Sequence, residues 1–262
     1  MAFIRSLFPI SISIACMTTV TLAQANYEIQ VYPSETVAPG DTMVELHSNF
    51  TGQGTKESID GVLPTDHVQH ETLEITQGFT PWFETGFYVF TSVGYNQGWQ
   101  WVGDHIRPRF RAPEEWEWPV GVSLSLEGGY QQRRFSPDTW TFELRPIVDK
   151  QIGRWYFALN PALEKSLKGV GSNQGWDFSP SGKFSYAISK KVALGLEYYG
   201  DVGPLGDFLG PSQQQHLIMP AIDIDFGKDW EFNFGVGVAM NKNTDSLVVK
   251  MIIGRRFHTV SP

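Results

Sequence analysis

Cysteine is nearly absent from this sequence: its 262 residues contain one, Cys16. That residue lies in a segment where the early cation Arg5 precedes an apolar run and the small-residue pattern Ala23-Gln24-Ala25. This order is typical of a secretory signal peptide and predicts cleavage before Asn26. Because cleavage removes the cysteine, the sequence argues against disulfides, cysteine nucleophiles and thiolate metal sites in the mature chain. Lipid modification of Cys16 is the alternative, although Ser13 stands where such sites usually have leucine.

Long apolar runs and positive charge are also scarce. Beyond residue 25, no stretch approaches the roughly 20 apolar residues that a transmembrane helix needs. The formal net charge of -8 argues against nucleic-acid binding, which usually requires a basic surface. The sequence contains no G-x-S-x-G, P-loop or G-x-G-x-x-G motif. These absences argue against helical membrane spans, a nucleic-acid partner and several common enzyme classes.

What the sequence contains instead is repeated alternation of apolar and polar residues, with the period of two expected of half-buried strands. Twelve such stretches occur, at Met43–Phe50, His70–Phe79, Phe83–Val93, His105–Ala112, Val120–Glu127, Trp140–Val148, Trp155–Leu163, Phe178–Ile188, Val192–Tyr199, His216–Ile224, Trp230–Val238 and Leu247–Phe257. The sequence therefore predicts an all-β protein, an antiparallel transmembrane β-barrel of about 12 strands.

The connections between these stretches alternate between short and long. Short links are predicted at 80–82, 113–119, 149–154, 189–191 and 226–229, and longer ones at 51–68, 94–104, 128–139, 166–175, 200–214 and 241–246. Outer-membrane barrels have short periplasmic turns and longer extracellular loops. The predicted organisation is a signal peptide (1–25), a periplasmic N-terminal arm (26–40) with a short strand at Glu28–Tyr32, and an outer-membrane barrel (41–262).

Tryptophans lie close to the ends of the predicted strands. Those expected to form two aromatic girdles at the membrane interfaces are Trp82, Trp116, Trp118, Trp140, Trp155, Trp176 and Trp230, with Trp99 and Trp101 near a long loop. A soluble β-sandwich is the alternative, but it would more naturally scatter or bury such residues. Five prolines fall inside predicted strands, where we expect bulges or kinks: Pro108, Pro146, Pro161, Pro180 and Pro220.

The face of the strands expected to line the lumen is charged. Its candidate lumen and selectivity residues are Arg107, Arg109, Arg111, Arg145, Glu84, Glu127, Glu143, Glu197, Asp223 and Asp225. One interpretation is a pore that is basic on one wall and acidic on the other and selects solutes by charge. The other is that arginines and carboxylates pair across strands and fill a narrow interior.

Two histidine-containing stretches are weak candidates for chemistry. In LHSNF, His47 and Ser48 are adjacent on a predicted strand, so they should face opposite sides and cannot share a proton. In HVQHE, the spacing of His67, His70 and Glu71 fits neither a helical zinc site nor a closed structural one. We therefore predict no catalytic residue, no metal site, no cofactor and no enzymatic activity.

The stretches EIQVYP, MVELHSNF, HETLEITQGFTPWFETGFYVFTS, FSPDTWTFELRPIVDK, LEYYG and WEFNFGVGV resemble a family of exported bacterial outer-membrane β-barrel proteins. The resemblance covers most of the mature chain and implies the barrel fold but no particular activity. The strand rhythm is also loosely similar to MetA-pathway-type barrels of phenol-degradation gene clusters, which are proposed transporters.

The leading functional hypothesis is a passive channel or uptake protein for small solutes in the outer membrane of a Gram-negative bacterium. The alternatives are a structural or adhesive barrel that acts through its loops and, less favoured, a lipid-modifying enzyme. The expected partners are outer-membrane lipids and lipopolysaccharide, a small solute, and the barrel-assembly machinery, for which Phe257 would supply the terminal aromatic residue.

Overall fold

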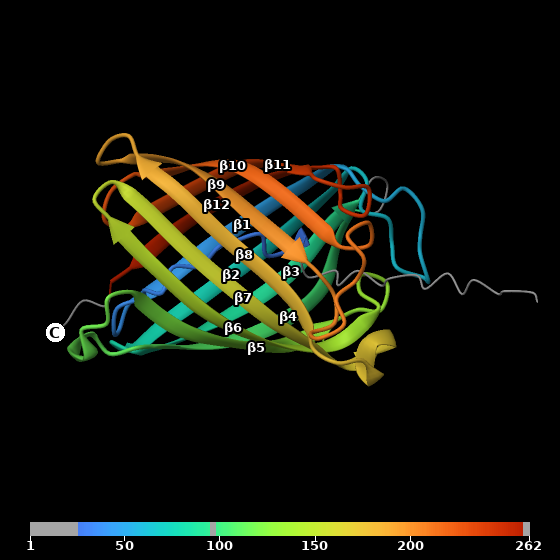
Figure 1. Ribbon diagram of the computed structural model, residues 1–262, viewed down its shortest axis with the longest axis horizontal. Coiled ribbons are helices and arrows are strands. Elements are labelled where there is room, and N and C mark those ends of the chain that lie inside the picture. Colours follow the sequence, from blue (N-terminus) through green and yellow to red (C-terminus); the bar gives the residue numbers. More distant parts are fainter. Residues whose placement is uncertain (1–25, 95–97, 259–262) are drawn as a thin grey trace, which may run out of the picture.

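The chain forms a closed antiparallel barrel in a computed structural model that describes residues 26–94 and 98–258 (Figure 1). The predicted signal peptide lies outside the described residues. The strands are β1 (Thr42–Gln53), β2 (Val68–Thr80), β3 (Phe83–Gly94), β4 (Gly98–Arg111), β5 (Gly121–Gln131), β6 (Asp138–Ile152), β7 (Trp155–Gly169), β8 (Asp177–Ala187), β9 (Val192–Asp201), β10 (Gln215–Asp225), β11 (Trp230–Ala239) and β12 (Leu247–Phe257). Two short 3-10 helices, η2 (Glu114–Trp116) and η3 (Val170–Asn173), lie in connections. Within the described ranges, no helix is long and apolar enough to cross a membrane.

Each strand pairs with its neighbours in sequence, and β1 pairs with β12 to close the barrel. Leu46 of β1, for example, lies opposite Leu73 of β2 on one side and Ile253 of β12 on the other. The twelve predicted strands and the antiparallel barrel are therefore confirmed. The main differences are extensions into predicted loops, because β4 begins at Gly98 and β7 continues to Gly169.

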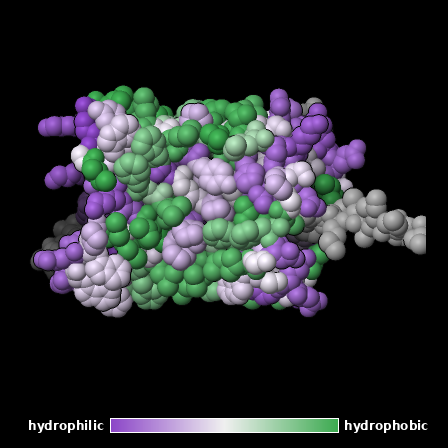
Figure 2. Space-filling model, in the orientation of Figure 1, coloured by the Kyte–Doolittle hydropathy of each residue, from purple (hydrophilic) through white to green (hydrophobic). Residues whose placement is uncertain are grey.

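The two faces of the wall differ sharply in chemistry. Along β1, buried Glu45, His47 and Asn49 alternate with the more exposed Leu46 and Phe50. Outward-facing apolar side chains also recur on other strands, including Phe87, Val89, Ile106, Leu159, Phe184, Leu194 and Leu196. Figure 2 shows hydrophobic residues over much of the middle of the wall and hydrophilic residues gathered at both ends. The apolar residues thus cover the outside, and most of the buried polar ones face inward.

The two ends of the barrel also differ. The connections at 54–67, 132–137, 170–176, 202–214 and 240–246 meet at one end, here called the long-loop end. The opposite, short-turn end holds the connections at 81–82, 112–120, 153–154, 188–191 and 226–229. The prediction of a long loop at 94–104 is wrong, since β3 extends to Gly94 and β4 already begins at Gly98.

The predicted girdle tryptophans all have exposed side chains. Trp82, Trp116, Trp118, Trp155 and Trp230 lie in or beside connections of the short-turn end, whereas Trp140 and Trp176 lie near the long-loop end. Trp99 and Trp101 belong to β4 itself.

The strands continue through their prolines without the expected bulges. Pairing between β4 and β5 is interrupted from Ile106 to Arg109, around Pro108, and resumes in the same register. The ladders β6–β7 and β10–β11 show the same kind of gap, around Pro146 with Pro161 and around Pro220. Proline has no N–H to donate, so the ladder loses bonds locally while the strand keeps its direction.

The N-terminal segment, residues 26–41 before β1, differs from the predicted periplasmic arm (26–40), and the short strand predicted at Glu28–Tyr32 does not form. It contains no strand, and Tyr27, Glu28, Ile29 and Tyr32 are buried. Asn26 donates a hydrogen bond to Asp245 in the β11–β12 connection, and Val37 reaches Glu84 near the start of β3. The segment therefore runs through the lumen from the long-loop end to the short-turn end.

Candidate functional site

The N-terminal segment is fixed near its middle by Tyr32. The Tyr32 N–H donates to Oδ1 of Asn160 on β7 at 2.7 Å, and Nδ2 of Asn160 donates to the Tyr32 carbonyl at 3.0 Å. The Tyr32 ring lies 4.5 Å from the guanidinium of Arg107 and 5.0 Å from that of Arg145. A buried asparagine that satisfies both backbone groups of one residue leaves that residue little freedom to move.

Polar contacts continue on the side of the short-turn end. Arg109 donates to the carbonyls of Pro33 and Glu35 at 3.0 and 2.7 Å. Ser34 donates through its N–H and its hydroxyl to Asp149 at 2.9 and 2.6 Å. The barrel wall thus supplies side-chain partners for backbone that forms no sheet.

Apolar and aromatic contacts anchor the other half of the segment. Tyr27 packs against Phe90 and lies edge-on to His70, with ring centroids 4.7 Å apart for the second pair. Ile29 joins Leu217 and Met219 of β10 in a second buried cluster. At its start, the segment meets Asp245, and burial raises the pKa of that carboxyl above its ordinary value of 3.8.

Most of the predicted lumen residues lie inside the barrel, and they are paired. Arg109 lies 2.6 Å from Glu84, and Arg107 lies 2.5 Å from Glu74. The remaining contacts of this group are Arg145–Glu143 at 2.7 Å, Arg145–Glu28 at 3.9 Å and His105–Glu127 at 2.6 Å. Charges of both signs are thus intermixed, and this favours the pairing interpretation over two walls of opposite charge.

A second ionic cluster lies on strands β8 to β12. Glu197 of β9 forms ion pairs with Lys250 of β12 and, at 3.2 Å, with Lys183 of β8. Lys183 also lies 2.6 Å from Asp223, which accepts a hydrogen bond from Asn233. Sequence reasoning missed Lys183 as a site residue. Its position on the polar face of a predicted strand could have indicated that it faces the lumen.

Two predicted residues lie at the end of the barrel instead. Arg111 is half-buried and pairs with the exposed Glu114 at 3.1 Å. Asp225 is exposed and accepts a hydrogen bond from the N–H of Gly227 in the β10–β11 turn. Neither takes part in the two buried clusters.

Cavities lie near both ends of the N-terminal segment. One, of about 580 Å³, is lined by long-loop residues together with Glu28, Glu143, Arg145 and Glu164. The other, of about 560 Å³, lies at the short-turn end and is lined by residues such as Ser34, Asp149 and Tyr156. They share no lining residue, and Val31, Tyr32 and Pro33 lie in the chain between the parts of the segment that line them.

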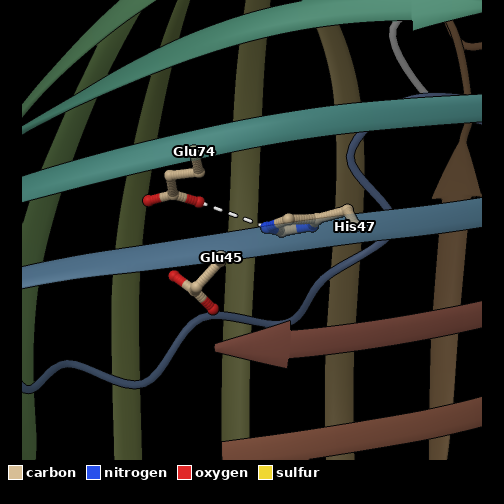
Figure 3. A group of neighbouring side chains, drawn as sticks. All are labelled: Glu45, His47 and Glu74. Carbon is tan, nitrogen blue, oxygen red and sulfur yellow. Dashed lines mark ion pairs between the residues drawn. The ribbon is translucent and has the colours of Figure 1, made fainter. Parts of the chain in front are cut away.

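The weak chemical candidates do not assemble into catalytic sites. Ser48 faces outward and donates to Glu71, whereas His47 is buried in the lumen, so the predicted separation of the pair is confirmed. His67 pairs with Asp66, and His70 packs on Tyr27, so the three residues of HVQHE have separate partners. The structure instead brings His47 together with Glu45 and Glu74, a group that sequence reasoning missed (Figure 3).

No family model and no curated protein matches this chain, but solved structures of porins do. The KdgM porin in complex with disordered oligogalacturonate aligns with 83% of this chain and 99% of its own, at 10% identity and a TM-score of 0.51. The NanC porin aligns with 83% of this chain and 100% of its own, at 6% identity and a TM-score of 0.53. These similarities establish that the chain has the fold of outer-membrane porins. The likeness to phenol-degradation barrels stays a prediction.

Proposed function

We propose that this protein is an outer-membrane channel for small solutes whose conducting path is controlled by the N-terminal segment. The observation that carries the proposal is the segment itself, which passes through a closed barrel and lines a cavity of about 580 Å³ near its start and one of about 560 Å³ near its end. A barrel with this number of strands can pass small molecules when no segment of the chain fills its interior.

The outer surface supports the membrane location. Large apolar side chains such as Phe87, Leu159 and Phe184 are exposed on the outer wall. A soluble monomer rarely exposes apolar surface on this scale, whereas lipid-facing strands require it. In an outer membrane, the short-turn end would face the periplasm and the long-loop end would face the cell exterior. Lipopolysaccharide and membrane lipids would contact the wall, and the barrel-assembly machinery would insert it.

The charge pattern indicates how solutes would be selected. Arg109 and Arg145 face carboxylates at short range, so an isolated basic wall is not expected to act on a passing solute. When the segment moves, Arg109 loses its bonds to Pro33 and Glu35, and Arg145 loses its contact with Glu28. Each arginine would then offer donors to an anion. We therefore propose that small anionic solutes, carboxylates included, are favoured by the open form.

The test is single-channel recording in planar bilayers with the mature chain and with a variant that lacks residues 26–33. The full chain should show small or rare conductance, and the shortened chain a larger and more anion-selective one. Arg109→Glu in the shortened chain should shift selectivity toward cations. An oligogalacturonate, the ligand type of the KdgM complex, serves as a first anionic solute. Equal conductance from folded samples of the full and shortened chains would refute control by the segment.

A second function remains supported by one observation: the middle of the lumen is filled by Tyr32 and its partners. A barrel that stays filled would act through its surface loops. In that case the shortened chain would conduct, but deletion of loop residues 54–66, and not release of the segment, would abolish the cellular phenotype.

A further inference from the structure

The group formed by Glu45, His47 and Glu74 lies in the inner wall where β1 pairs with β2. Glu45 and His47 are two positions apart on β1, and Glu74 lies directly opposite Glu45 in the β1–β2 register. Their inward positions follow from the strand period of two. Figure 3 shows Glu74 of β2 and His47 of β1 facing each other, with Glu45 of β1 beside them. One potential ligand atom from each lies within 4.8 Å of the other two.

The three side chains are deeply buried yet keep unsatisfied polar atoms. Their exposed fractions are 6% for Glu45, 0% for His47 and 1% for Glu74. Oε1 of Glu45, both ring nitrogens of His47 and Oε2 of Glu74 make no hydrogen bond to the part of the chain that the structure describes. The contact between His47 Nε2 and Glu74 Oε2 is 3.3 Å long. Leaving several buried polar atoms unpartnered is unfavourable, so the ring nitrogens and carboxylate oxygens gathered here are available to bind a ligand.

The orientation of Glu74 is fixed by partners outside the group. Its Oε1 accepts hydrogen bonds from Arg107 at 2.5 Å and from the Thr76 hydroxyl at 2.7 Å. These bonds leave Oε2 directed at His47. Carboxylate ligands of metal ions are commonly held in this way by hydrogen bonds to the second oxygen.

The local charge favours a cation. Gly254 of β12 lies between Glu45 and Glu231, and a Cβ there would be 3.0 Å from Cγ of Glu45 and 2.9 Å from Cγ of Glu231. Three carboxylates thus gather around this region, and Arg107 contacts the group through Glu74. A doubly charged cation would compensate the remaining negative charge of these carboxylates.

We propose that Glu45 Oε1, His47 Nε2 and Glu74 Oε2 bind a divalent transition-metal ion of the zinc class. The imidazole favours zinc over magnesium or calcium, which prefer oxygen ligands alone. Zinc accepts nitrogen and carboxylate ligands at about 2.0–2.2 Å, with water in a fourth position. A modest contraction of the group would provide that geometry, and the ion would cross-link β1 to β2.

The test is zinc binding by the refolded full mature chain in detergent, followed by titration calorimetry and by the visible absorption of bound Co²⁺. The background carries His67→Gln and His258→Gln, which remove two exposed histidine–carboxylate pairs. One equivalent of zinc should bind. His47→Gln should weaken binding by at least about 100-fold, because loss of an outer partner alone typically costs about 10- to 100-fold.

The matched control is His70→Gln, which removes a buried lumen histidine that packs on Tyr27 and should leave zinc affinity unchanged. Heat-dependent gel mobility reports whether His47→Gln folds. If it does not fold, Glu45→Gln provides a second variant. The proposal is overturned if the folded background protein binds no zinc. It is equally overturned if a folded His47→Gln or Glu45→Gln variant binds zinc as well as the background does. Conductance is not a readout, so this outcome is independent of channel function.

Discussion

The substitution Asn160→Ala should release the N-terminal segment while the barrel remains folded. Asn160 is buried, lies on β7 and holds both the N–H and the carbonyl of Tyr32. Alanine keeps the strand and removes both hydrogen bonds. Since the contacts belong to the segment and not to the ladder, their loss should act on the position of the segment more than on strand pairing.

The magnitude follows from those two bonds. Each contributes about 0.5–1.5 kcal/mol when water can replace the lost partner, so the pair is worth about 1–3 kcal/mol. This free energy corresponds to an increase of about 5- to 150-fold in the ratio of released to seated segment. The guanidinium contacts of Arg107 and Arg145 with the Tyr32 ring remain, so release should be partial.

The assay is single-channel recording, with open probability as the readout. Asn233→Ala is the matched control, because Asn233 also faces the lumen but bonds to Asp223 and Glu197 and not to the segment. Open probability should rise in Asn160→Ala and stay unchanged in the control. Refutation would be an Asn160→Ala channel indistinguishable from the unaltered protein, or an equal rise in both variants.

Three further perturbations test other parts of the structure. Gly78→Ala would place a Cβ 2.2 Å from the Ala38 carbonyl oxygen, so the end of the segment must shift. Thermal unfolding should show that the free energy of unfolding falls by about 1–3 kcal/mol. Lys250→Met leaves Glu197 with Lys183 as its cation and should cost about 3 kcal/mol, near the lower end for a broken buried pair, in urea unfolding. His258 donates to Asp41 and Asp229, which raise its pKa above 6.5, so its stabilising contribution is present below that pH and is lost as pH rises through the raised pKa. The stability difference from His258→Ala should therefore shrink as the pH rises above about 6.5 and through the raised pKa of His258.

Each of these predictions has a simple control. Gly175→Ala adds a Cβ with no neighbouring atom within 4 Å and should be neutral, unlike Gly78→Ala. Lys168→Met removes an exposed lysine and should leave urea unfolding unchanged. A pH-independent effect of His258→Ala would mean that its charge does not stabilise the barrel.

The barrel could be predicted from the sequence because an apolar outer face and a polar interior impose alternation on the strands. Leu247–Phe257 was predicted at the residues that β12 occupies. The start of β4 was missed because the β3–β4 register shifts between Phe90 and Thr91, opposite Gly103 and Trp101, and such a bulge breaks the alternation.

The N-terminal segment could not be placed from its own residues. Its alternating apolar residues resemble a strand, yet Tyr27, Glu28 and Ile29 are buried in succession because the lumen encloses the segment on all sides. The contact of Glu84 with Arg109 follows from a short hairpin, whereas Glu197 and Lys250 belong to β9 and β12 and meet through the curvature of the barrel. Local sequence specifies strands and faces but not contacts made across a lumen.

The central claim is that residues 26–41 occupy the lumen, and an engineered disulfide tests it most directly. A Cβ at Gly121, the first residue of β5, would lie 3.2 Å from Cβ of Ser34 in the segment. Disulfides typically join Cβ atoms about 3.5–4.5 Å apart, so the two positions must separate slightly, and Asp149 Oδ1, which would lie 2.2 Å from the new Cβ, must also shift. In the mature chain with Ser34→Cys and Gly121→Cys, mild oxidation should link the two positions in nearly all folded molecules, as measured by mass spectrometry of digested protein. Folded barrels that form no such link would contradict the placement of the segment and, with it, the proposed control of the channel.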